Sequence, residues 1–179
     1  MKLSSLAQLA IDAAGGLDRW RQFETISARL AVGGVLWPLK HQQGVLDDVR
    51  VRVDQRKEWA SHRPFGAPDL RTSFQPHRVA IETTEGKTVE ELLQPRDSFK
   101  GHSVDTPWSR LQLAYFAGYA MWTYLNTPFL ISVGRRRDGG GGTVAGKWRD
   151  LEALKGHLPA EHRQPQRRPD VLFRCRRST

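Results

Sequence analysis

The residue types that most often carry catalysis or bind metals are scattered along this chain. Asp47 and Asp48 are neighbours, so on a strand they would point to opposite faces and could not form one acid–base pair. The histidines of the first 133 residues are dispersed, with no close metal-ligand spacing among them, and we expect solvated loop histidines and no metal site. Four of them lie in the first 133 residues: His41, His62, His77 and His102.

Sequence signatures of the common catalytic sites are not found either. The chain has no nucleophile elbow, zinc-protease motif, P-loop or dinucleotide fingerprint. The glycine run 139–142 lacks the Lys-Ser/Thr that would complete a phosphate loop. We therefore expect no catalytic residue and no cofactor, and we favour a protein that is not an enzyme. An enzyme with an unrecognised site stays open as an alternative.

Aromatic residues are the one feature that goes beyond an ordinary core. They are explained by core packing or by an apolar ligand pocket, and both interpretations stay open. A pocket would take an apolar small molecule or a lipid. Its candidate ligand-binding residues are Trp37, Trp59, Trp108, Tyr115, Tyr119 and Trp122.

The elements that would position these rings follow from hydrophobic periodicity. Apolar residues at helical spacing predict a helix that ends at Gly15 and Gly16, with a short second turn over 17–20. Alternation predicts antiparallel strands joined by short turns. Thr106 and Pro107 predict the start of an aromatic helix that ends near 126, and a strand is expected over 129–133. The predicted strands lie at 25–32, within 45–53, at 56–62, at 78–83 and at 88–93.

The aromatic helix raises the question of a membrane span. Residues 111–133 hold no charged side chain and are long enough to cross a bilayer. A helix-start signal just before this stretch and the stop at Asn126, Thr127 and Pro128 favour a buried helix followed by a strand, with the membrane span as the minor alternative. The N-terminus has no continuous apolar region typical of a signal peptide, so we expect a cytoplasmic protein.

Positive charge is concentrated at the C-terminal end. The chain has a formal net charge of +9, yet residues 1–134 hold 16 Lys and Arg against 14 Asp and Glu. Residues 135–179 hold 12 against 5 and are rich in Arg, Gly and Pro. The sequence therefore predicts a domain over 1–133 and a basic, low-order tail over 134–179. Three interpretations of the tail compete: a nucleic-acid-binding arm, a flexible linker with a small helix, and translation in the wrong frame.

Reading permitted codons in a shifted frame favours the third interpretation, translation in the wrong frame. One permitted set of codons for residues 170–178, read one base later, encodes Thr-Phe-Tyr-Ser-Asp-Ala-Asp-Gly-Leu, a strand pattern followed by a hairpin turn. A shifted reading of 134–148 likewise gives more acidic, globular patterning. We therefore predict a frameshift after about residue 134, which would make the chain a truncated, non-functional product of the kind a pseudogene encodes.

Residues 14–20, 43–49, 105–108 and 113–129 resemble a family of uncharacterised bacterial proteins. The order of a helix, Gly15-Gly16, a short turn and long strands is also distantly similar to the lipoprotein-carrier (LolA-like) half-barrel proteins. That resemblance implies a curved antiparallel sheet wrapped on a helix, with an apolar concave face that could take a lipid. It supplies no catalytic residue.

These observations predict an α+β fold. We expect a curved antiparallel sheet, an incomplete half-barrel, packed on an N-terminal helix and on a buried aromatic helix, with a disordered basic tail. The basic residues within the domain, near 50–63, are accompanied by acids, so we expect no specific nucleic-acid binding. The expected function is apolar-ligand binding, and a basic-tailed nucleic-acid binder is the alternative.

Overall fold

The computed structural model describes residues 5–133 and 174–177. Within this range the chain forms two compact units. One contains residues 5–20 and 127–133, and the other contains residues 21–126 and 174–177.

The first unit consists of short helices: α1 (Ser5–Ala13), α2 (Leu17–Trp20) and α5 (Leu130–Val133). Helix α1 ends in a Schellman motif, in which Gly16 N–H donates to the Ile11 carbonyl at 2.9 Å and Gly15 N–H donates to the Asp12 carbonyl at 3.0 Å. Gly15 has a φ of 101°, a conformation that favours glycine. The rings of Trp20 and Phe129 stack with centroids 5.1 Å apart.

The predicted strand over 129–133 is wrong, because residues 130–133 form helix α5. Pro128 and Phe129 provide the carbonyls that accept from Ile131 N–H and Ser132 N–H at 3.0 and 2.9 Å. The Ser132 hydroxyl also donates to the Phe129 carbonyl. These local bonds satisfy the backbone without a partner strand, so the apolar composition of the segment is a poor guide to its conformation.

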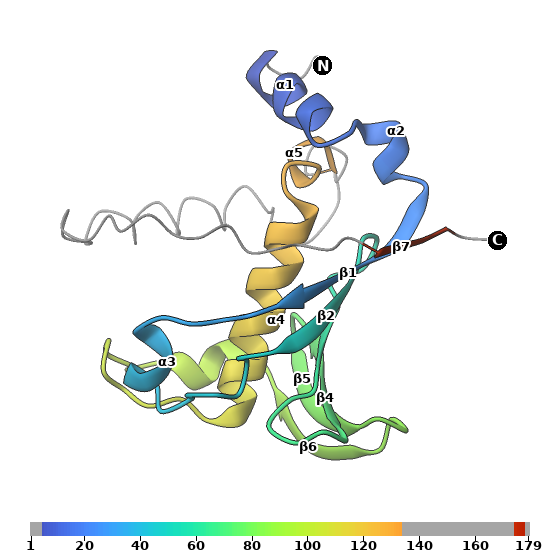
Figure 1. The fold of residues 1–179 in the computed structure, drawn as a ribbon. Coiled ribbons are helices and arrows are strands. Elements are labelled where there is room, and N and C mark those ends of the chain that lie inside the picture. The colour runs from blue at the N-terminus through green and yellow to red at the C-terminus, as the bar shows by residue number, and fades with distance from the viewer. Residues whose placement is uncertain (1–4, 134–173, 178–179) are drawn as a thin grey trace. The chain divides into compact units, whose positions relative to one another are not determined.

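The second unit is an antiparallel sheet with one long helix on it (Figure 1). The strand order is β6-β5-β4-β3-β2-β1-β7, and each strand is antiparallel to its neighbours. The strands are β1 (Phe23–Leu30), β2 (Val49–Asp54), β3 (Ala60–Arg63), β4 (Leu70–Gln75), β5 (Arg78–Thr83), β6 (Thr88–Leu93) and β7 (Arg174–Arg177). The remaining elements are α3 (Leu36–Leu39), the 3-10 helix η1 (Pro95–Phe99) and α4 (Arg110–Asn126).

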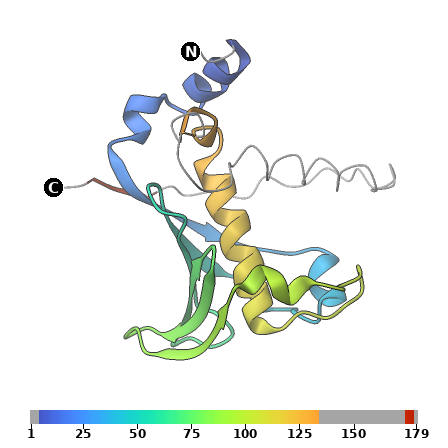
Figure 2. The same ribbon diagram turned by 180° about the vertical axis from the view of Figure 1, so that it is seen from behind.

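Helix α4 lies across one face of the sheet and contacts β2, β3, β4, β5 and β6 (Figures 1 and 2). Alternation along β2 explains why this face is the packed one. Val49, Val51 and Val53 are buried towards α4, whereas Arg50 and Arg52 are exposed on the opposite face. The predicted α+β class, with an antiparallel sheet packed on a buried aromatic helix, is therefore confirmed.

The closest approach of helix and sheet is at Gly118. A Cβ atom on Gly118 would overlap Cβ and Cγ of Phe74 on β4, so only glycine fits there. Phe74 itself has no exposed surface and belongs to the cluster of Val51, Val53 and Ala60. This contact fixes how α4 presents its tyrosines to the sheet.

The sheet is open, and the predicted half-barrel is not closed: β6 and β7 are its edges within the described part of the chain. Residues 174–177 of the predicted low-order tail pair with β1. The rest of the tail lies outside the described residues, so its predicted disorder and the predicted frameshift stay predictions, as does the boundary at 133/134. Packing of the N-terminal helix on the sheet also stays a prediction.

Candidate functional site

A connected set of aromatic rings lies on the α4 side of the sheet. Tyr115 and Tyr119 are one helical turn apart on α4, and their rings are stacked with centroids 6.4 Å apart. Both rings contact the ring of Phe74 on β4, with centroid distances of 5.6 Å for Tyr115 and 6.4 Å for Tyr119. Further rings extend the set towards the N-terminus of α4. Their contacts are Phe99–Tyr115 at 5.9 Å, Phe99–Trp108 at 5.7 Å, Trp108–Phe116 at 4.9 Å and Trp37–Phe116 at 6.3 Å.

The start of α4 determines where this set begins. Thr106 and Pro107 were expected to open the helix, but the helix begins at Arg110. Ser109 and Gln112 form a capping box: the Ser109 hydroxyl accepts from Gln112 N–H at 3.1 Å, and the Gln112 amide oxygen accepts from Ser109 N–H at 2.9 Å. Trp108 therefore precedes the helix.

A buried lysine secures the segment before α4. The Lys40 ammonium group donates to the carbonyls of Ser103, Val104 and Thr106 and lies 5.2 Å from the centroid of the Trp108 ring. Lys40 is only 5% exposed, and its carbonyl accepts from Trp108 N–H at 3.0 Å. Sequence reasoning missed this role, because no local pattern distinguishes Lys40 from a surface lysine.

The other end of the set is held by Trp122. Its indole N–H is 2.9 Å from the carbonyl of Asp54 at the end of β2 and 2.9 Å from the carbonyl of Lys57 in the β2–β3 connection. Trp122 packs on the same cluster as Tyr115 and Tyr119. This double contact ties α4 to the turn that also contains Glu58.

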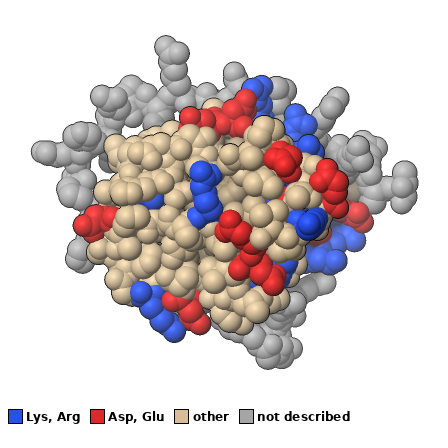
Figure 3. Space-filling view, turned by 90° about the horizontal axis from the view of Figure 1, so that it is seen from below, with Lys and Arg blue, Asp and Glu red and all other residues tan. Residues whose placement is uncertain are grey.

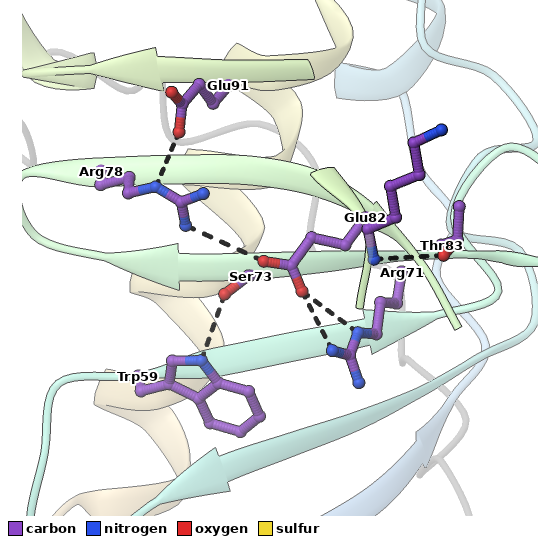
Figure 4. A network of polar contacts seen from close by, with 8 residues as sticks. Trp59, Arg71, Ser73, Arg78, Glu82, Thr83 and Glu91 are labelled. Atoms are coloured by element: carbon purple, nitrogen blue, oxygen red, sulfur yellow. Dashed lines mark hydrogen bonds and ion pairs between the residues drawn. The ribbon is translucent and has the colours of Figure 1, made fainter. Parts of the chain in front are cut away.

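Trp59 does not belong with the other five candidates. It immediately precedes Ala60, which is buried on the α4 side, so Trp59 lies on the opposite face of the sheet. There its indole N–H donates to the Ser73 hydroxyl at 3.4 Å (Figure 4), and the Arg52 guanidinium lies 5.2 Å from its ring centroid. The structure thus brings Trp37, Trp108, Tyr115, Tyr119 and Trp122 to the α4 side and separates Trp59 from them.

Two charged residues act on the tyrosines. Burial raises the pKa of Tyr115. Arg96 lowers this pKa, whereas Tyr119 and Glu58 raise it further. Burial also raises the pKa of Tyr119, and Glu58 adds to this effect while Arg96 opposes it. Both phenols therefore stay protonated at neutral pH and can donate hydrogen bonds. Glu58 lies in the β2–β3 connection and Arg96 lies on η1, and sequence reasoning missed both.

His62 corrects the expectation of solvated loop histidines. It lies on β3 with no exposed surface, and its backbone N–H donates to the Thr72 hydroxyl at 2.8 Å. Burial lowers the pKa of His62 to about 4, so the ring is neutral at pH 7. Its Nε2 has no hydrogen-bond partner among the described residues.

Comparison of the chain with family models, with curated proteins and with solved structures gave no match. Among the described residues, no helix has the length and apolar character needed to cross a membrane.

Proposed function

We propose that the ring set on the α4 side binds an apolar small molecule or a lipid. The observation that carries this proposal is that the candidate rings are partly exposed. These rings are Trp37, Trp108, Tyr115, Tyr119 and Trp122. A closed core is already present beneath them in residues such as Phe74 and Leu113, which have no exposed surface. Rings that lie over a buried core and still reach solvent are typical of ligand sites.

The polar groups around the rings favour a ligand with one polar end. Tyr115 and Tyr119 keep their phenolic protons, and the side chains of Glu58 and Arg96 influence both. A carbonyl, hydroxyl or carboxyl group on an otherwise apolar ligand could accept from these donors. Broad uncharged areas also lie on the surface seen from below (Figure 3). The expected resemblance to half-barrel carriers implies an apolar concave face for such a ligand.

The proposal is tested by titrating the full-length protein with a fluorescent fatty-acid analogue and measuring the dissociation constant. Replacing the half-buried Tyr119 (Tyr119→Ala) should weaken binding about tenfold, since one lost ring contact and its hydrogen bond together approach the 1.4 kcal/mol that a factor of ten requires.

Tyr124 provides the matched control, because it lies on the same helix but is 67% exposed. Tyr124→Ala should leave the dissociation constant within about twofold. Equal weakening in both variants, or probe uptake that does not saturate, would contradict a site at the ring set.

A further inference from the structure

The sheet face opposite α4 has a row of arginines in cross-strand register. Arg29 on β1 pairs with Arg50 on β2, and Arg50 pairs with Arg63 on β3. All three are exposed. Adjacent strands are about 4.8 Å apart, so the backbone positions of the three arginines lie within about 10 Å of one another. Arg52 lies two residues from Arg50 on the same face, over the ring of Trp59.

The neighbouring half of the same face is neutralised by ion pairs. Glu82 is 3.1 Å from Arg71 and 3.9 Å from Arg78, and Glu91 is 2.9 Å from Arg78 (Figure 4). These pairs connect β4, β5 and β6. Cross-strand pairs of opposite charge stabilise a sheet, whereas like charges directly opposite one another destabilise it.

The arginine row is compensated at Arg29, at one end. Asp48 forms two hydrogen bonds with Arg29, at 2.8 and 2.6 Å. Arg50 and Arg63 form no ion pair among the residues that the structure describes. The pKa of Glu85 is lowered chiefly by the Thr84 hydroxyl, and Arg63 makes only the smallest contribution. The β1–β3 half of this face therefore has uncompensated positive charge.

We propose that this arginine row, with Trp59 beside it, binds single-stranded nucleic acid. Guanidinium groups bind phosphates through two parallel hydrogen bonds, a geometry that lysine lacks, and the row contains only arginine. A nucleic-acid strand has one phosphate charge per nucleotide, so Arg50 and Arg63 can each bind one phosphate of the same strand. Trp59 provides a partly exposed ring on the same face, and base stacking on such rings is typical of single-strand binding.

The sequence predicted that acids near residues 50–63 balance the domain's basic residues. The cross-strand register of the sheet shows that Arg50 and Arg63 lie opposite other arginines, while the nearby acids have other partners. Asp54 accepts from the backbone N–H groups of Arg56 and Lys57 within its own turn. Glu24 is 3.7 Å from Arg56. Neither acid is paired with Arg50 or Arg63, so proximity in sequence overstated the compensation.

The test is fluorescence anisotropy of a labelled oligothymidylate on the full-length protein over a range of salt concentrations. The double variant Arg50→Gln, Arg63→Gln should bind at least about tenfold more weakly, and the slope of log K against log salt should become shallower by about 1.4. Arg78→Gln is the matched control on the same face, since Arg78 is already compensated by Glu82 and Glu91. It should change binding by less than about twofold, and any contribution from the basic C-terminal segment is equal in both proteins.

A second arm separates stacking from charge alone. Trp59→Leu should weaken oligothymidylate binding about threefold to tenfold and leave the binding of inorganic polyphosphate unchanged. Unaltered thermal unfolding of each variant shows that the fold is retained. Equal loss in the arginine variants, or polyphosphate binding as tight as oligothymidylate binding with no effect of Trp59→Leu, would overturn the proposal.

Discussion

His62 and Lys40 are polar side chains in the interior of the protein, and their environments have opposite consequences. Lys40 is surrounded by three carbonyls and a ring, so its charge is stabilised where it lies. His62 is enclosed without a charge partner, and burial lowers the pKa of its ring. Each residue gives a test of the structure at the scale of a single side chain.

The stability of the protein should fall as pH drops below about 6.5. His62 has its ordinary pKa of 6.5 when unfolded and about 4 when folded, so between these values the unfolded chain binds the additional proton. The stabilisation is fully present above pH 6.5 and is lost as pH approaches 4, by roughly 3 kcal/mol. Urea unfolding from pH 4 to 7.5 should show this slope in the native protein and a flatter one in His62→Gln.

The exposed residue His77 provides the control, and His77→Gln should keep the slope. A slope unchanged in His62→Gln would contradict the assignment.

Replacing Lys40 by methionine should reduce stability by about 1–3 kcal/mol, because the carbonyls of Ser103, Val104 and Thr106 lose a buried donor. Thermal unfolding measures the loss, and near-ultraviolet circular dichroism should change as Trp108 loses its neighbouring charge. Lys100 is exposed and paired with the exposed Asp97, so Lys100→Met should change stability by no more than about 0.5 kcal/mol. Equal effects would mean that Lys40 is not enclosed.

At the scale of elements, periodicity predicted β5, β6, α1 and α2 closely but missed β4. Leu70, Thr72 and Phe74 do alternate with Arg71, Ser73 and Gln75. The signal was obscured because Thr72 and Ser73 are polar yet nearly fully buried. Thr72 is satisfied by its hydrogen bond with His62 N–H, a contact that only the folded sheet creates. Polarity in sequence therefore did not indicate exposure.

The candidate site was predicted in part for a related reason. Helical spacing places Tyr115, Tyr119 and Trp122 on one helix, so their proximity follows from the sequence. Assigning Trp59 to the opposite face required the register of β3, and the contributions of Glu58 and Arg96 required the tertiary arrangement of the β2–β3 connection and of η1. These are long-range properties that no local pattern contains.

The contact of α4 with β4 predicts that Gly118→Ala destabilises the protein. Alanine favours helix formation over glycine by about 1 kcal/mol, but its Cβ would overlap Phe74, and overpacking of this kind costs about 1–3 kcal/mol. Chemical denaturation should therefore show a net loss or no gain. Gly33→Ala is the control, because nothing lies within 4 Å of its added Cβ, and it should be neutral or slightly stabilising. Clear stabilisation by Gly118→Ala would contradict the close approach.

At the scale of the whole molecule, β7 connects the end of the chain to the sheet. It pairs with residues Phe23 to Ser27 of β1 and covers an edge that would otherwise be available for association. A chain ending at residue 173 should therefore self-associate more than one ending at 177, as measured by light scattering over a concentration series. Equal behaviour of the two truncated chains would contradict the role of β7.

The cytoplasmic location and the frameshift stay predictions, and sequencing the gene across the codons for residues 125–179 tests the latter.

The ring set on the α4 side is the proposed ligand site. Photolabelling of the full-length protein with a diazirine-bearing fatty acid, followed by peptide mass spectrometry, tests it most directly. We expect labels on peptides containing Trp108, Tyr115 and Tyr119 that are competed away by unlabelled fatty acid. Labels concentrated on the Trp59 face, or labelling that the competitor does not reduce, would contradict it.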